Sequence, residues 1–162
     1  MSSSDRRAFL TLSAAAALAA CGFTPAYGPS GAATALRGRV RATDPSTAFD
    51  YAFVARIEER LGRPEAEAFA LTYGIETETF AIGITQQNEV MRHDLSGVAN
   101  WALKDSAGKT LASGTAQSFT AWFASGTTVA TQAAEVDAGK RLMQALADQV
   151  VTQLIAKAGT LP

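Results

Sequence analysis

Hydrophobic positions recur every three or four residues in two stretches of the chain and alternate with polar positions between them. The longer spacing is typical of a helix with one apolar side, and alternation is typical of a strand. We predict a first helix with Asp44 as N-cap and Pro45 in its first turn, and Gly62 and Pro64 as its end. Its apolar stripe recurs every four residues and comprises Phe49, Phe53, Ile57 and Leu61.

A second, longer helix is predicted over residues 129–158. Residues 125–128 are small and polar and can cap it, and Gly159 follows its last turn. At ~1.5 Å per residue this helix would be about 40 Å long, which exceeds a typical small sheet. We therefore expect part of it to project beyond the sheet. Its apolar stripe comprises Val136, Met143, Leu146, Val150 and Leu154.

Residues 35–42 are predicted to form a first strand, because apolar and basic side chains alternate there. One face of this strand would carry three arginines, Arg37, Arg39 and Arg41. Such a stripe has two interpretations. Guanidinium groups bind phosphate and carboxylate in bidentate fashion, and a charged edge strand also discourages aggregation without binding any ligand.

Residues 69–84 are predicted to form a second strand with an irregularity. Its apolar positions are odd-numbered up to Ile75 and even-numbered from Phe80 onward. Since a shift of one position moves a side chain to the opposite face, we expect a β-bulge or a sharp bend at residues 77–79.

The remaining strands are predicted over residues 95–103 and 111–123, with a glycine-containing turn at 105–108 and a polar loop at 86–94. The elements follow the order β-α-β-β-β-α. The fold class is therefore α+β, with two helices packed on one face of a four-stranded mixed sheet. The last three strands should form an antiparallel meander, and the first strand connects through a helix and can be parallel to the second.

The N-terminal segment is typical of a bacterial lipoprotein signal. Arg6 and Arg7 precede an apolar run that is too short to span a bilayer and that ends in Leu18-Ala19-Ala20-Cys21. Cys21 is the only cysteine, and a thiolate is the nucleophile that lipid attachment requires. A lone cysteine can also be a small core residue, but its place at a cleavage site favours acylation. We predict a signal peptide over 1–20, an acylated tether over 21–33 and a single domain over 34–162.

Composition narrows the function further. The formal net charge is −1, so the chain has no basic excess that would favour nucleic acid. His93 is the only histidine and is interpreted as an exposed loop residue, so neither a zinc site nor a catalytic triad is predicted. The sequence also lacks a phosphate-binding glycine motif. We expect no cofactor besides the covalent lipid on Cys21, and a binding or assembly protein in place of an enzyme.

The segment Cys21-Gly22-Phe23-Thr24-Pro25-Ala26-Tyr27-Gly28 resembles the mature start of LptE, the lipopolysaccharide-assembly lipoprotein family. The resemblance continues through Trp101-Ala102-Leu103, Ser118-Phe119 and the alanine-rich last helix. It implies a non-enzymatic protein of the outer membrane, anchored by its acyl chains on the periplasmic side. It further implies that the protein plugs the LptD β-barrel, assists its assembly and helps pass lipopolysaccharide to the cell surface.

The resemblance also implies where lipopolysaccharide is touched. Family members use basic residues near the loop between the second and third strands and in the segment before the last helix. Arg92 matches the first region, whereas residues 110–139 contain neither lysine nor arginine. Contact with lipopolysaccharide is therefore expected from Arg92, from Arg37, Arg39 and Arg41, or from neutral polar groups. Two alternatives stay open: a lipoprotein auxiliary to a lipid-transport ABC system, and a tethered periplasmic enzyme.

Overall fold

The computed structural model describes residues 25–29, 31–84, 90–124, 127–159 and 161. Four strands form one sheet in the order β1-β2-β3-β4, in which β1 is parallel to β2 and the other pairs are antiparallel. This arrangement confirms the predicted fold class. The elements are the short 3-10 helix η1 (Ala32–Ala35), β1 (Val40–Ala42), α2 (Ala48–Leu61), β2 (Phe69–Ile84), β3 (Val90–Lys104), β4 (Thr110–Phe123) and α3 (Thr128–Ala158).

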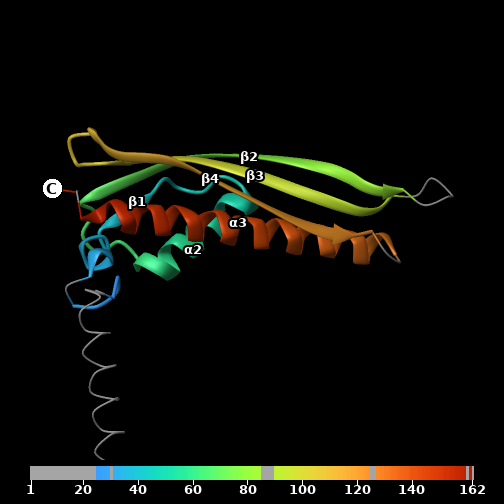
Figure 1. Ribbon diagram of the computed structural model, residues 1–162, viewed down its shortest axis with the longest axis horizontal. Coiled ribbons are helices and arrows are strands. Elements are labelled where there is room, and N and C mark those ends of the chain that lie inside the picture. Colours follow the sequence, from blue (N-terminus) through green and yellow to red (C-terminus); the bar gives the residue numbers. More distant parts are fainter. Residues whose placement is uncertain (1–24, 30, 85–89, 125–126, 160, 162) are drawn as a thin grey trace, which may run out of the picture.

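The molecule is elongated, and its two ends differ (Figure 1). Both α2 and α3 lie against the same face of the sheet. Helix α3 runs along the sheet, whereas α2 underlies only the end that carries β1. We call this the proximal end; the distal end holds the last residues of β2 and β4 and the start of α3. The predicted projection of α3 is not observed, because β2 and β3 are about as long as the helix.

The core lies between the helices and the covered face of the sheet. Helix α2 contributes Phe53 and Ile57, and α3 contributes Leu142 and Leu146; all four are essentially inaccessible to solvent. A Cβ atom on Gly97 would lie 3.0 Å from a methyl carbon of Leu142, so this glycine lets α3 approach β3 closely. Of the stripe predicted for α3, Val136 differs, because it lies near the distal end, beyond α2, and is 55% exposed.

Helix α2 begins three residues later than predicted. The cap is Thr47, whose hydroxyl accepts a hydrogen bond from the Asp50 amide, while the Asp50 carboxylate accepts one from the Thr47 amide. This reciprocal capping box satisfies two amides of the first turn. Asp44 does not cap the helix, because its carboxylate pairs with Arg41. The end is as predicted: Gly62 follows the last turn with a φ of 81°.

The first strand is shorter than predicted, and the arginine stripe is absent from it. Only Val40–Ala42 pair with β2, while η1 and a turn occupy the preceding residues. Gly38 breaks the extended chain with a φ of 66°, and its amide donates to the Leu61 carbonyl at 2.7 Å. Arg37 and Arg39 therefore lie in a turn, and of the three arginines only Arg41 lies on a strand.

The predicted bulge in β2 is also absent. Pairing with β3 is continuous from Ala70 to Ile82, with no shift at residues 77–79. The strand therefore keeps its geometry, and it is the apolar residues that change face. Odd-numbered side chains such as Leu71 are buried under the helices, whereas Phe80 and Ile82 lie on the uncovered face.

The predicted loop at 86–94 is partly strand, because β3 starts at Val90. Pairing with both neighbours fixes its first residues: His93, for example, lies between Ala81 of β2 and Trp122 of β4. The turn between β3 and β4 is as predicted. Gly108 has a φ of 81°, and the Asp105 carboxylate accepts from the amides of Ala107 and Lys109.

Candidate functional site

The uncovered sheet face carries an apolar surface at the distal end. Cross-strand pairing places Ile82, Arg92 and Phe123 in one row and Phe80, Asp94 and Ala121 in the next. The third row ends in Phe119 of β4. We call the four large side chains the distal apolar patch: Phe80 (44% exposed), Ile82 (45%), Phe119 (76%) and Phe123 (61%). Exposed apolar side chains that gather in this way mark sites of interaction.

Arg92 lies within this patch, between Ile82 and Phe123. Its Nε donates to an Asp94 carboxylate oxygen at 2.8 Å, which holds the guanidinium against the sheet. Among the described residues, its terminal nitrogens have no partner, so they can still bind an anion. A cation surrounded by exposed apolar side chains suits a ligand that carries both negative charge and hydrocarbon.

His93 lies on the opposite, helix-covered face and is not a loop residue. Its ring stacks on Trp122, with 4.9 Å between ring centroids and 13° between planes. This contact explains the histidine as part of the packing under the distal end. Across the described residues, no group of three histidine, cysteine or acidic side chains could hold a metal ion.

A second basic group reaches the distal half of the sheet from α3. Arg141 donates from Nη1 to the Thr120 hydroxyl at 3.1 Å and from Nη2 to the Ala121 carbonyl at 3.3 Å, and its Nε pairs with Asp137. Sequence reasoning expected no basic group in this region, because residues 110–139 contain no lysine or arginine. Arg141 lies just beyond this range, and only the packing of α3 on β4 shows that its side chain reaches the sheet. The i,i+4 pair of Asp137 and Arg141 is a helix-surface signal, but it does not show which strand the arginine reaches.

The structure does not bring the predicted arginines together. Arg41 pairs with Asp44 and Glu67 at the proximal end. Arg39 lies 5.1 Å from the centre of the Phe69 ring, and Arg37 is exposed on the turn before β1. Eleven positions of β2 separate the Leu71 row, beside β1, from the Ile82 row that holds Arg92. At about 3.3 Å per residue, this separation is roughly 35 Å.

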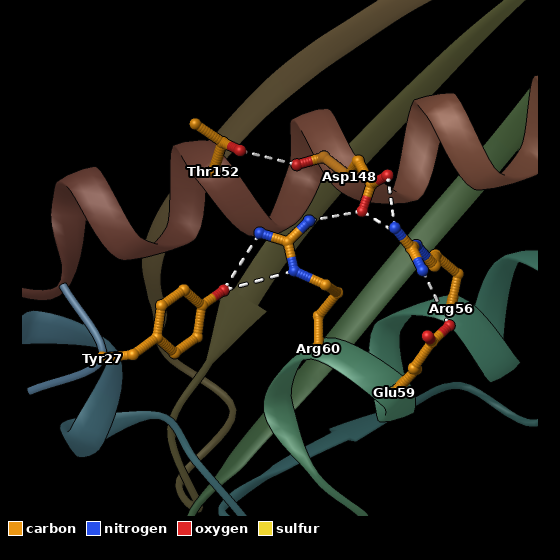
Figure 2. Close-up of polar contacts among 6 residues, drawn as sticks. All are labelled: Tyr27, Arg56, Glu59, Arg60, Asp148 and Thr152. Carbon is orange, nitrogen blue, oxygen red and sulfur yellow. Dashed lines mark hydrogen bonds and ion pairs between the residues drawn. The ribbon is translucent and has the colours of Figure 1, made fainter.

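The proximal end holds a polar cluster that joins the N-terminal arm to both helices (Figure 2). The Tyr27 hydroxyl accepts from Nε and Nη2 of Arg60 at 3.3 and 3.0 Å. Arg60 also donates to Asp148 of α3, and Arg56 binds the same carboxylate through two bonds of 3.0 Å. Bidentate, charge-assisted bonds are among the stronger polar contacts in proteins. The arm is thus fixed to the domain from Tyr27 onward.

Two opposing effects act on the Asp148 carboxyl. Partial burial favours the neutral form and raises its pKa, whereas the hydrogen bonds and charges of Arg56 and Arg60 lower it. The net result is a pKa below the usual carboxyl value, so the group is ionised in the folded protein.

The acylation residue predicted from sequence, Cys21, lies outside the described residues. No helix in the described part of the chain is long and apolar enough to cross a membrane. A hollow of about 510 Å³ lies beside β1 and the β3–β4 turn, and Arg41 at its rim is already paired with two carboxylates.

Comparison with known proteins identifies relatives of this architecture. The family model for LptE, described as lipopolysaccharide-assembly, matches residues 30–154. No curated protein sequence matches significantly. A solved structure described as a lipoprotein from Caulobacter crescentus CB15 is similar with a TM-score of 0.68 and 18% identity, covering 82% of this chain and 98% of that one.

Two more solved structures share the fold. Rare lipoprotein B from Shewanella oneidensis has a TM-score of 0.56 and 13% identity, covering 75% of this chain and 95% of that one. Lipoprotein B from Nitrosomonas europaea has a TM-score of 0.57 and 16% identity, with coverage of 75% and 84%. At these identities the likeness concerns the fold.

Proposed function

This chain belongs to the LptE family of lipopolysaccharide-assembly proteins, and from that premise we propose that it is an outer-membrane lipoprotein that plugs an LptD-like β-barrel. In this proposal Cys21 carries the lipid anchor, and the protein assists both assembly of the barrel and delivery of lipopolysaccharide to the cell surface. The family is one of non-enzymatic assembly lipoproteins.

The observation that carries the proposal is the distal apolar patch around Arg92. Lipopolysaccharide combines phosphate groups with acyl chains, and the patch offers a guanidinium beside four exposed apolar side chains. Phosphate–guanidinium bonds are charge-assisted and can be bidentate. Because the ion pair with Asp94 uses only Nε, the terminal nitrogens of Arg92 are left for the ligand.

The arrangement of the two ends supports the same proposal. Tyr27 is fixed to Arg60 at the proximal end and follows Cys21 by only six positions. Six extended residues span at most about 21 Å. A lipid on Cys21 would therefore hold the proximal end close to the membrane surface and keep the distal patch away from the anchor.

Charge reversal at Arg92 tests the proposed lipid contact. At low ionic strength, Arg92→Glu should weaken the binding of purified lipopolysaccharide to the full chain by about tenfold, because one charge-assisted contact becomes repulsive. The loss should shrink as salt rises. Folding should be nearly unchanged, since Arg92 is an exposed side chain.

Arg39→Glu is the matched control, because it makes the same charge change at the proximal end. Its affinity should stay within about twofold of wild type, which is the scatter expected of a residue outside the contact. Wild-type binding by the Arg92 variant would refute the distal contact. An equal loss in both variants would indicate a general charge effect and would refute it as well.

A further inference from the structure

The two edges of the sheet differ in whether their outward-facing backbone groups are hydrogen-bonded. On β4, side chains spaced along α3 bond the outward-facing groups. Gln149 binds both the amide and the carbonyl of Gln117, and Gln153 donates to the Thr115 carbonyl at 3.0 Å. Lys157 and Arg141 donate to carbonyls farther along the strand in each direction. This outer edge is therefore largely closed to another strand.

The outer edge of β2 is different. Near its start the Phe69 amide and the Leu71 carbonyl bond toward β1, so odd-numbered residues of β2 direct their polar groups away from β3. Strand β1 ends at Ala42, and β2 continues to Ile84 without a register shift. Among the described residues, nothing bonds the outward amides and carbonyls of the later odd positions, Ile75, Thr77, Thr79 and Ala81.

This open edge lacks most of the features that usually block strand addition, although Glu76 and Glu78 place negative charge on one face of it. Residues 76–82 are exposed on both faces, and they contain no proline, lysine or bulge. Figure 1 shows β2 as the outermost strand here, with no helix beyond it. The uncovered face of this segment carries Glu76 and Glu78, followed by Phe80 and Ile82.

We propose that the outer edge of β2 over residues 75–81 binds an extended segment of a partner protein as a fifth strand. Backbone bonds to the odd-numbered residues would supply affinity, and side chains on the uncovered face would supply specificity. The partner segment would carry basic side chains opposite Glu76 and Glu78 and apolar side chains opposite Phe80. The argument uses only the strand edge and is independent of the proposed function.

The charges also bear on pairing with a second copy of this chain. Antiparallel pairing centred on Thr77 would place Glu76 opposite Glu78 of the other copy, and pairing centred on Glu78 would place this residue opposite itself. Like charges directly opposite each other destabilise a strand pair. Pairing centred on Thr79 would instead place Glu78 opposite Phe80, which forms no ion pair, whereas a basic segment pairs with both glutamates.

The test uses a synthetic peptide designed to pair antiparallel with β2. From its N-terminus, alternate positions carry valine, valine, lysine and lysine, with threonines between them. The probe is titrated into the purified full chain in mild detergent, and amide hydrogen exchange is followed by NMR. We expect the amides of Ile75, Thr77 and Thr79 to exchange rapidly without the peptide and to become protected with it. The Gln117 amide, which is already bonded, should not change.

Methylating the peptide amides that face β2 should weaken binding by roughly tenfold or more, whereas methylating the alternate amides should have little effect. Thr79→Pro should cause a similar loss, because its amide faces outward. Thr115→Pro makes the same change on the closed edge of β4 and is the matched control. The double variant Glu76→Lys and Glu78→Lys should no longer bind the lysine peptide. It should instead bind a peptide in which glutamates replace the two lysines.

Three outcomes of the peptide experiment would overturn the proposal, and a fourth concerns the free protein. The three are an absence of binding, binding that is insensitive to methylation of the inward amides, and protection on β4 in place of β2. A concentration-dependent dimer that protects the same β2 amides would also overturn it and would assign the edge to a second copy.

Discussion

At the scale of single residues, Asp148 joins three parts of the chain. It accepts from Arg56 and Arg60 of α2, and Arg60 also donates to Tyr27 of the N-terminal arm. The carboxylate is 34% exposed, which is less than the 66% of Asp137 in its surface pair with Arg141. Removing its charge would leave two partly buried guanidinium groups without their shared partner.

We therefore predict that Asp148→Asn lowers the free energy of unfolding at pH 7 by about 1–3 kcal/mol. Because folding lowers the carboxyl pKa, this contribution is full above the unfolded-state value, near 3.8, and is lost as pH falls through the lower folded-state pKa. When unfolding by urea is measured below pH 4, the difference in unfolding free energy between wild type and variant should become smaller. Asp137→Asn, in the same helix, should shift stability by no more than about 0.5 kcal/mol. Equal effects of both variants would show that Asp148 has no special role.

At the scale of elements, the placement of α2 on the sheet depends on its buried stripe. Phe53 is fully buried and packs on Tyr73 with ring centroids 4.8 Å apart, whereas Tyr51 on the same helix is 63% exposed. Phe53→Ala should lower the free energy of unfolding by roughly 3–5 kcal/mol, since it removes a large side chain from a packed core. Tyr51→Ala should change it by no more than about 0.5 kcal/mol. Chemical denaturation midpoints that coincide for the two variants would contradict this packing.

The elements themselves were largely predictable, because they depend on local periodicity and turn chemistry. The end of α2 at Gly62 and the turn at Asp105 follow from the sequence. Which face of each element is covered by other elements does not follow from the sequence. The parity change before Phe80 predicted a bulge, but it marks where the apolar residues move to the face that no helix covers. The short β1 depends on Gly38, whose amide bonds the Leu61 carbonyl.

At the scale of the whole molecule, the two ends divide the features between them. The proximal end fixes the N-terminal arm through Tyr27, and the distal end exposes the apolar patch around Arg92. The sequence singled out Arg92 only through its resemblance to a family. Sequence alone could not separate Arg92 from Arg39 and Arg41 or bring Arg141 to β4, because these distances depend on strand register and helix packing.

The central claim, that this protein is a lipid-anchored plug of an LptD-like barrel, is tested most directly by native mass spectrometry. The protein would be isolated with its associated proteins from outer membranes in mild detergent. The claim predicts a chain that begins at Cys21, carries acyl chains there and is bound one-to-one to a large β-barrel protein. Cys21→Ala should remove the lipid mass, and each buried acyl methylene contributes about 0.8 kcal/mol to membrane retention. A chain with unmodified Cys21, or one isolated without a stoichiometric barrel, would contradict the claim.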